Sequence, residues 1–523
     1  MKKLIPLLLA LVMIVSVFAA CGPKTPAQST EKPDGSKGPQ ASGDKDPGKE
    51  PGDETDPVVP VDPTKQLNID LDALDYGNRE FYVYHWTTSN PEFDVDEEAA
   101  AGDPIQEALY QRNLKLEEGL GIKLNFHNED GHDNKQENFV SKLETRIQDP
   151  ETPVDLIAAY SRTAPHVMAA GLAVDLLAYA EDLDLSKAWW PALVRETHEI
   201  KGRLFYTSGD ASTGLLTMIE TLFMNKGMFK SLGHDYDKFI KDVKKGDWTI
   251  DDLITYCTGV YQDLDDKAGE SNGDMFGIIA ENVGFGDGMW TAFGYKLFDI
   301  SNDEDKVYTL SADLTGENAA SFVKKLTEFS NTNDAHLQYE FADDVMSAAD
   351  KLAAFSAGNT LFMEMRMVSF DASVVDCDYT ILPLPKGSDT QERYYTCVGN
   401  PYNLYSICSA ALDKDLVAQT LQTWGYYGYT LTTPAVFEVT FKGKVAKDDY
   451  AIEMFDLIRE NITFEIGRTF DRYTGTMLPN VVSRAWVNNS SWSSVMSAGQ
   501  QKILNMRMDS ANKKLVELLS ITE

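Results

Sequence analysis

The chain has 523 residues, of which 43% are hydrophobic and 11% aromatic, and its formal net charge is −35. A single hydrophobic core rarely supports a chain of this length, so at least two lobes are expected. The strong negative charge leaves no basic face to neutralise phosphates, which excludes nucleic-acid binding as the function.

The first 20 residues predict a secretory signal sequence. Lys2 and Lys3 precede an apolar run, Leu4–Ala20, that ends in small residues. Small residues directly before Cys21 resemble the lipobox of bacterial lipoproteins, although Phe18 stands where leucine is usual. By that resemblance, cleavage leaves Cys21 as a lipid-bearing N-terminus. A plain cleaved signal and an uncleaved membrane anchor are the alternatives.

Residues 21–66 predict a disordered linker. The segment consists largely of Pro, Gly, Ser, Asp and Lys and has no aromatic residue. Such a composition buries too little apolar surface to offset the entropy lost on ordering. We expect it to act as a flexible tether between the membrane and the folded part of the chain.

Strands and helices alternate from residue 78 onward. The pattern predicts strands at 79–86, 122–127 and 154–160, with helices at 103–121, 138–148 and 164–180 between and after them. The segment 154–160 is apolar except for Asp155, as is typical of a strand buried in a parallel sheet. This order indicates a doubly wound α/β lobe.

A second α/β lobe is predicted inside the first. Residues 202–226 read as two strands joined by a polar link, and 247–264 as a helix capped by Thr249. The remaining pattern predicts strands at 275–281, 360–366 and 379–387, and helices at 319–331, 351–357, 411–428, 448–462 and 499–520.

The cysteines and histidines suggest no metal site or cofactor. The cysteines beyond the signal, which occur without CxxC spacing, are Cys257, Cys377, Cys397 and Cys408. A structural zinc site is therefore not expected. Disulfides and free thiols are the two alternatives for these cysteines. The seven histidines form no metalloprotease motif.

Several segments, in their order and spacing, resemble the extracellular solute-binding proteins, family 1, of ATP-driven (ABC) importers. They include "VDLIAAY", "GRLFYTSGD", "LFMNKGMFKSLG", "KGDWTIDDL" and "FSAGNTLFMEMR", and the resemblance covers nearly all of residues 78–470. It implies an α/β, two-lobed periplasmic-binding-protein-like fold (type II), with discontinuous lobes joined by strand hinges. The implied crossings lie near 206–222, 379–385 and 429–436.

The resemblance also implies the domain limits. Lobe I comprises 67–210 and returns at 381–432, lobe II comprises 211–380, and a C-terminal helical part, 433–523, packs mainly on lobe II.

By the same resemblance, the chain is a binding protein rather than an enzyme. It captures a solute, a sugar or oligosaccharide, between the lobes and delivers it to the membrane permease of an ABC importer. It works as a monomer, lipid-anchored on the outer face of the cytoplasmic membrane of a Gram-positive bacterium. The alternatives are a secreted hydrolase that acts on polysaccharide, a peptide-type solute binder, and a surface adhesin.

Candidate ligand contacts are polar and aromatic residues just past predicted strand ends or in a crossing, because ligands of α/β sheets bind beyond the carboxyl ends of strands. The candidates are Trp86, Tyr160, Arg162, Asp210, Glu281, Trp290, Glu364, Arg366, Asn400 and Tyr402. The alternative interpretation places each aromatic residue in the core and each charge on a solvated loop. Trp189, Trp190 and Trp248 are expected to pack within their own lobes.

An acidic loop at 263–274 carries aspartates at EF-hand positions 1, 3 and 12, namely Asp263, Asp265 and Asp274. Lys267 and Ala268 break the calcium pattern, so a solvated acidic loop is expected rather than a metal site.

Overall fold

The structure is a computed structural model that describes residues 62–88, 92–265, 267, 270–338 and 346–521. The predicted signal sequence, Cys21 and the linker as far as residue 61 lie outside the described residues. In the part that is described, no helix combines the length and the hydropathy that a membrane span requires. Val61–Glu523 form one unit, which is divided into two lobes.

Lobe I is built on a four-stranded sheet with the order β12-β3-β1-β2. Its strands are β1 (Arg79–Trp86), β2 (Ile122–Glu129), β3 (Leu156–Tyr160) and β12 (Asn403–Ile407). β1 runs parallel to β2 and β3, whereas β12 is antiparallel to β3. Every residue of β3 is buried, as expected for a strand covered on both faces. The carboxyl ends of β1, β2 and β3 consequently meet at one edge.

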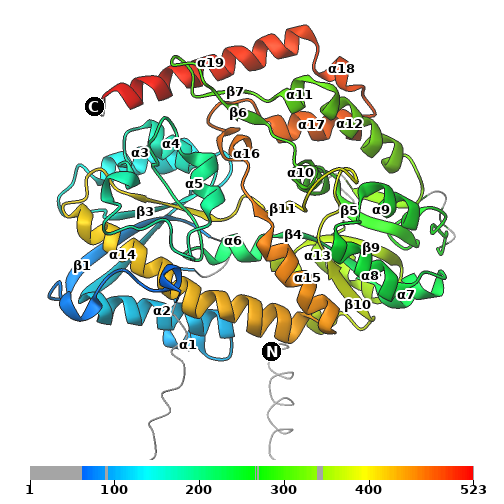
Figure 1. Cartoon of the computed structure of the whole chain (residues 1–523), viewed down its shortest axis with the longest axis horizontal. Helices are drawn as coiled ribbons and strands as arrows, with labels where there is room; N and C mark the ends of the chain where they lie inside the picture. Colours follow the sequence, from blue (N-terminus) through cyan, green and yellow to red (C-terminus); the bar gives the residue numbers. More distant parts are fainter. Residues whose placement is uncertain (1–61, 89–91, 266, 268–269, 339–345, 522–523) are drawn as a thin grey trace, which may run out of the picture. The chain divides into compact units, whose positions relative to one another are not determined.

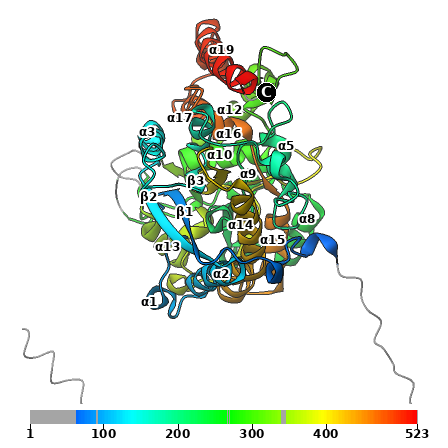
Figure 2. The ribbon, with the colours of Figure 1, turned by 90° about the vertical axis from the view of Figure 1, so that its left-hand side faces the viewer.

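Helices cover both faces of this sheet, with α2 (Pro104–Leu120) on one and α3 (Gln136–Arg146) on the other, as Figures 1 and 2 show. The Asp103 side chain caps the start of α2 by accepting from the backbone N–H of Ile105, and Gly121, with a φ of 63°, ends the helix. The other helices of lobe I are α1 (Glu97–Ala100), α4 (Ala164–Ala169), α5 (Ala192–His198) and α14 (Lys414–Tyr427).

The chain contacts lobe I from the first described residues. Short 3-10 turns form at Pro63–Lys65, Leu71–Ala73 and Leu176–Tyr179. The Lys187 ammonium donates to the Pro63 carbonyl at 3.0 Å, and the Ala188 N–H donates to the Thr64 carbonyl at 2.9 Å. Residues 62–66, which the sequence assigned to the linker, are therefore tied to the folded part of the chain.

Lobe II holds a five-stranded sheet with the order β10-β4-β9-β5-β8. Its strands are β4 (Glu220–Asn225), β5 (Phe276–Glu281), β8 (Ala335–Gln338), β9 (Thr360–Arg366) and β10 (Tyr379–Leu382). β5 is parallel to β8 and β9, whereas β4 is antiparallel to both β9 and β10. The start of β4 therefore lies beside the carboxyl ends of β5 and β9.

The helices of lobe II surround this sheet (Figure 1). They are α7 (Lys226–Ser231), α8 (Tyr236–Lys245), α9 (Ile250–Cys257), α10 (Asn282–Ala292), α11 (Ala312–Thr315), α12 (Glu317–Ser330), α13 (Ala348–Ser356), α15 (Asp449–Glu460), α17 (Leu478–Val487) and α18 (Trp492–Val495). A hairpin of β6 (Phe298–Ile300) and β7 (Tyr308–Leu310) follows α10, and 3-10 turns form at Met367–Ser369 and Ala372–Val374. The predicted cap of α9 is confirmed, because Thr249 and Asp252 form a reciprocal capping box.

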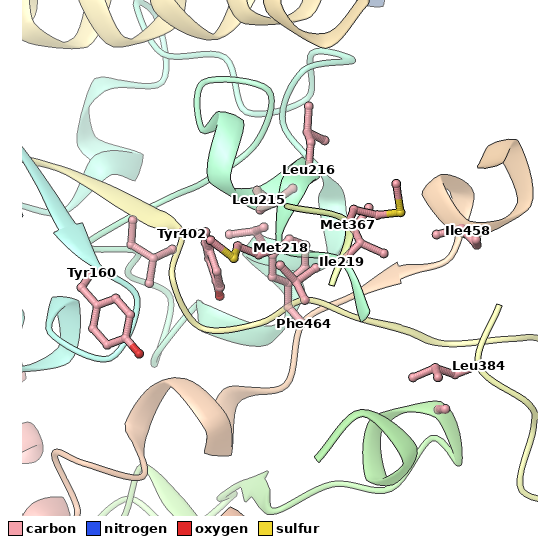
Figure 3. Packing of buried hydrophobic residues seen from close by; sticks show 14 of the residues in the cluster. Tyr160, Leu215, Leu216, Met218, Ile219, Met367, Leu384, Tyr402, Ile458 and Phe464 are labelled. Carbon is pink, nitrogen blue, oxygen red and sulfur yellow. The ribbon is translucent and has the colours of Figure 1, made fainter. Parts of the chain in front are cut away.

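Two extended segments connect the lobes side by side. Residues 205–219 leave lobe I and residues 398–405 return to it, paired through bridges at Thr207–Tyr405 and Ile219–Val398. A short helix, α6 (Thr213–Thr217), lies between the predicted polar link and the second predicted strand, which is β4. Met218, Ile219 and Met367 pack together at this crossing, as Figure 3 shows.

The third connection is helical, although the sequence predicted a strand hinge there. α14 continues into the π-helical segments η6 (Gly428–Thr432) and η7 (Ala435–Val445), which lead to α15 in lobe II. Gly428 is required at this point, because a Cβ atom would lie 2.0 Å from the Asp210 carbonyl oxygen. Long π-helical stretches are rare and often lie at functional sites.

The C-terminal part contacts both lobes. β13 (Ile462–Thr463) pairs with β11 (Thr396–Cys397), and α16 (Ile466–Phe470) follows it. α17 packs on α10 and α12, whereas α19 (Ala498–Ile521) packs on β7 and on α4 of lobe I. The buried Asn512 amide fixes α19 to β7, since its oxygen accepts from the Val307 and Tyr308 N–H groups at 2.9 Å.

Candidate ligand-binding site

A cavity of about 300 Å³ lies between the lobes. Lobe I, lobe II, the first crossing and η7 all contribute to its walls. Its lining residues are Trp86, Thr88, Glu92, Asp103, Ile105, Gln106, Thr213, Gly214, Thr217, Met218, Met367, Val368, Phe370, Pro401, Thr440, Phe441 and Val445. Clefts between lobes that combine apolar walls with a few polar groups are the usual place for a small-molecule ligand.

Trp86, predicted as a ligand contact, is the aromatic side chain of lobe I in this wall. It ends β1 and is held in place by a hydrogen bond from its indole N–H to the Asn403 side-chain oxygen at 2.7 Å. The rings of Tyr160 and His132 lie 5.0 and 5.9 Å from it. Tyr160 is likewise predicted, and the structure places it at the end of β3 beside Trp86. The two strand ends thus present one aromatic cluster.

Glu92 lines the same cavity and was not predicted. Its carboxylate accepts from the Thr213 N–H at 2.8 Å, and its backbone carbonyl accepts from Arg112 at 2.7 Å. Burial raises the pKa of Glu92 above its ordinary value, against the attraction of Arg112. Glu92 comes from a loop rather than from a strand end, so the rule used on the sequence could not find it.

The lobe II edge carries a charged cluster in which three predicted residues meet. Glu364 and Arg366 lie two residues apart on β9 and so face the same side. Arg366 pairs with Glu220 at the start of β4, at 2.6 Å, and Glu281 at the end of β5 pairs with Lys351 of α13 at 3.0 Å. Glu220 was not predicted, because only its antiparallel register with Arg366 brings it here.

The charges in this cluster shift the pKa values of their neighbours. The charge of Glu220 raises the pKa of Arg366, which remains a cation. Burial, followed by repulsion from Glu220, raises the pKa of Glu364 well above its ordinary value. These groups line a separate small cavity of about 80 Å³ together with Gly284, Ala348, Met365 and Ser369.

Arg162 and Asn400 lie together near the carboxyl end of β3, but their polar groups already have partners. Arg162 is buried and pairs with Asp471 at 3.1 Å, and its Nε also lies 3.5 Å from the Arg468 carbonyl. With its amide turned so that the oxygen faces Arg162, Asn400 accepts from this guanidinium at 3.2 and 3.3 Å. In this conformation Arg162 therefore joins lobe I to the segment that contains α16.

Tyr402 is a buried residue of the returning segment. Its ring lies 6.2 Å from that of Phe464, and Figure 3 shows the two near Met218. Burial raises the pKa of Tyr402 to about 12.

Asp210 and Trp290 line neither cavity, and the same holds for Tyr160, Arg162, Asn400 and Tyr402. Asp210 accepts a hydrogen bond from Thr433 at 2.6 Å, at the third connection, and burial raises its pKa to about 6. Trp290 is 2% exposed and packs against Phe322 of α12 at 5.2 Å, within lobe II. Contact of either residue with a ligand stays a prediction.

The acidic loop brings carboxylate oxygens of Asp263, Asp265 and Asp274 within 4.8 Å of one another. The buried Asp274 carboxylate accepts from the N–H groups of Leu264 and Ser271, and Lys267 pairs with Asp265. These contacts fit an internally bonded acidic loop. Cys257, Cys377, Cys397 and Cys408 are free thiols.

The sequence matches no protein-family model, and a comparison with curated proteins also gives no match. Solved structures do match. The galacto-N-biose-/lacto-N-biose I-binding protein of the ABC transporter from Bifidobacterium longum, in complex with lacto-N-biose, gives a TM-score of 0.51 at 14% identity, over 84% of this chain and 98% of that one. CpMnBP1 with mannotriose bound gives 0.50 at 13% identity, over 82% and 100%.

A family 1 extracellular solute-binding protein from Bifidobacterium longum subsp. infantis gives a TM-score of 0.48 at 16% identity, over 85% of this chain and 100% of that one. At these identities the likeness establishes the fold and no more. The predicted fold class is confirmed: this chain has the two-lobed α/β fold of the ABC-transporter solute-binding proteins.

Proposed function

We propose that the chain is an extracellular solute-binding protein that holds a saccharide between its lobes and delivers it to the permease of an ABC importer. The 300 Å³ cavity is the observation that carries this proposal, because both lobes and the first crossing contribute to its walls. A ligand held there contacts both lobes at once, as hinged closure around a ligand requires.

The chemistry of the cavity suits a carbohydrate. The Trp86 indole offers a flat apolar surface to the C–H groups of a sugar ring, while Glu92, Thr213 and Thr440 offer polar groups to its hydroxyls. Two solved structures of the same fold hold saccharides, lacto-N-biose in one and mannotriose in the other. We propose no enzymatic activity, and we propose that lipid on Cys21 keeps the protein beside its permease.

Calorimetry with mannotriose and lacto-N-biose, followed by a thermal-shift screen of neutral oligosaccharides, tests the binding function. A ligand at about 100 times its dissociation constant adds about 2.7 kcal/mol to the free energy of unfolding. We expect at least one saccharide to stabilise the protein and to remain chemically unchanged. Product formation would favour a hydrolase, whereas binding of peptides alone would leave the transport role and overturn the substrate class.

Trp86→Ala tests the place of the ligand. Loss of a well-buried aromatic anchor costs about 2 kcal/mol, or about thirtyfold in affinity. Trp290→Phe is the matched comparison, because its indole is buried in lobe II and lines neither cavity. We expect Trp86→Ala to weaken binding and Trp290→Phe to leave it within threefold of the parent. The reverse result would place the site at α10.

A further inference from the structure

The small cavity at the edge of lobe II holds more carboxyl groups than cations. Glu220, Glu281 and Glu364 line it, against Lys351 and Arg366. These residues come from β4, β5, β9 and α13, while Gly284 of α10 and Ser369 of the turn after β9 complete the lining without a charge. Two ion pairs, Glu281–Lys351 and Glu220–Arg366, leave Glu364 as the carboxyl group without a cationic partner in the described cluster.

Two buried carboxyl groups here could accept more hydrogen bonds than the described residues donate to them. Glu220 is 3% exposed, and its Oε2 atom has no hydrogen-bond donor among the described residues. Glu364 is 4% exposed and accepts from the Glu281 N–H at a long 3.3 Å. Buried acceptors in native proteins nearly always have a hydrogen-bond donor, so we expect a donor to these two carboxyl groups. A proton on Glu364 is the donor that the cluster itself supplies to Glu220.

The cavity is much smaller than the one between the lobes, at about 80 Å³ against about 300 Å³. We expect it to take one substituent of a sugar, with the ring outside it. Gly284, in the first turn of α10, keeps this space open. A Cβ atom at Gly284 would lie 3.8 Å from the Glu281 Oε2 atom and 3.9 Å from the Glu364 Oε1 atom.

We propose that this cavity is a subsite for an ammonium group, so that the protein prefers saccharides that carry a free amine. The proposal rests on the proposed binding of saccharides and narrows their class. The ammonium donates to Glu220 and Glu364, and the proton that Glu364 held passes to solvent. One positive charge replaces another, so the buried cluster stays balanced. A uronate would instead place a fourth carboxylate beside three and is rejected.

Calorimetry with three β-1,4-linked glucose-type disaccharides, one cationic, one neutral and one anionic, tests the preference. The probes are the glucosamine disaccharide, cellobiose and cellobiouronic acid. We expect the glucosamine disaccharide to bind at least tenfold more tightly than cellobiose, and cellobiouronic acid to bind more weakly than both. Repeating each titration in two buffers of different ionisation enthalpy measures how many protons are released or taken up on binding. At a pH where the free sugar amine is already fully protonated, we expect proton release with the glucosamine disaccharide and none with cellobiose.

Two variants distinguish the effect of the Glu364 carboxyl group from the effect of the cavity volume. Glu364→Gln keeps the volume but has no proton to release, so the preference for the amine should fall at least tenfold and the proton release should vanish. Gly284→Ala narrows the cavity without a change in charge, and alanine favours the helix. It should weaken binding of the glucosamine disaccharide at least tenfold and leave the melting temperature at or above that of the parent. The control variant Glu199→Gln, directly after α5, should change neither the affinity for the glucosamine disaccharide nor the proton release.

The outcomes distinguish this inference from the proposed function. Equal affinity for the glucosamine disaccharide and cellobiose, preference for the uronate, or an unchanged amine preference in both variants overturns the subsite, while the binding function stands. Failure of these three probes together with mannotriose and lacto-N-biose overturns both. Amine preference with proton release in the parent, lost in Glu364→Gln, supports the subsite.

Discussion

Buried carboxyl groups gather where the chain passes between the lobes. Glu465, just before α16, accepts from the backbone N–H groups of Leu297 and Arg468 at 3.0 and 2.8 Å. Burial nevertheless raises the pKa of Glu465 to about 7. Asp471, after α16, has its pKa raised by burial to about 6, against the attraction of Arg162. Single residues at this junction therefore titrate near neutral pH.

We expect the free energy of unfolding to fall as the pH rises from 4.5 to 7. The unfolded chain releases the Glu465 proton near pH 4.5, whereas the folded chain keeps it until about pH 7. In this window the folded state binds more protons, so a stabilising contribution of up to about 3 kcal/mol, complete below the window, is lost as the pH rises through it. Urea unfolding followed by tryptophan fluorescence at several pH values measures the slope.

Glu465→Gln provides the comparison for this slope. The amide does not titrate, so the variant should show a flatter profile between pH 4.5 and 7 whatever its stability at any single pH. Glu199→Gln, at the partly exposed residue directly after α5, should keep the parent slope. An identical slope in Glu465→Gln and the parent would show that another group is responsible.

At the scale of elements, α16 connects the two lobes through buried ion pairs. Arg468 within α16 binds Asp287 of α10 in lobe II with three contacts between 2.6 and 3.1 Å. Arg162 of lobe I binds Asp471 directly after α16. Both arginines also contact the returning crossing, because Arg468 donates to the Val398 carbonyl at 2.6 Å and Arg162 donates to the Asn400 side chain. Opening of the lobes therefore has to break these ion pairs or move α16.

Asp287→Asn should destabilise the protein by about 3 kcal/mol, because it leaves the buried Arg468 guanidinium without a countercharge. Urea unfolding measures this loss, and hydrogen exchange should show faster opening of α16. The control is Glu199→Gln, which removes the partner of the half-exposed Arg195 and should cost about 0.5 kcal/mol at most. A loss below about 1 kcal/mol in Asp287→Asn would mean that the bridge contributes little to stability.

Local patterns in the sequence predicted elements well and long-range pairs poorly. The strand 79–86 and the capped start of α9 follow from neighbouring residues, and the structure confirms both. Glu220 reaches the candidate site through register with a strand about 140 positions later, which no window of sequence reveals. The π-helical connection was also missed, since Gly428 and Pro434 are typical of a break in a helix.

At the scale of the whole chain, the candidate ligand site and the proposed lipid attachment site lie far apart in the sequence. The candidate site begins at Trp86, whereas the proposed lipid attachment is at Cys21. The described chain is already fixed to lobe I at Pro63 through Lys187. The residues between Cys21 and Asp62 are therefore those available to act as a tether.

Cys21→Ser should move the protein from the membrane fraction into the medium, or leave an unprocessed precursor, because the lipidated thiol is lost. Fractionation and immunoblotting measure this. Several acyl chains anchor firmly at about 0.8 kcal/mol per buried methylene. Full processing of the variant with unchanged retention in the membrane would contradict the anchor. A chain that begins at Asp62 should unfold at the same temperature as the mature protein, since it keeps the contacts of Pro63 and Thr64.

The antiparallel pairing of β12 with β3 sets the order in which the two sheets can be completed as the chain is made. Synthesis proceeds from the N-terminus, so β1, β2 and β3 appear early, by residue 160. Their edge partner, Asn403–Ile407, emerges about 240 residues later. All strands of lobe II lie between residues 220 and 382. Lobe II can therefore complete its sheet first, while the edge of β3 stays exposed until its last strand has been made.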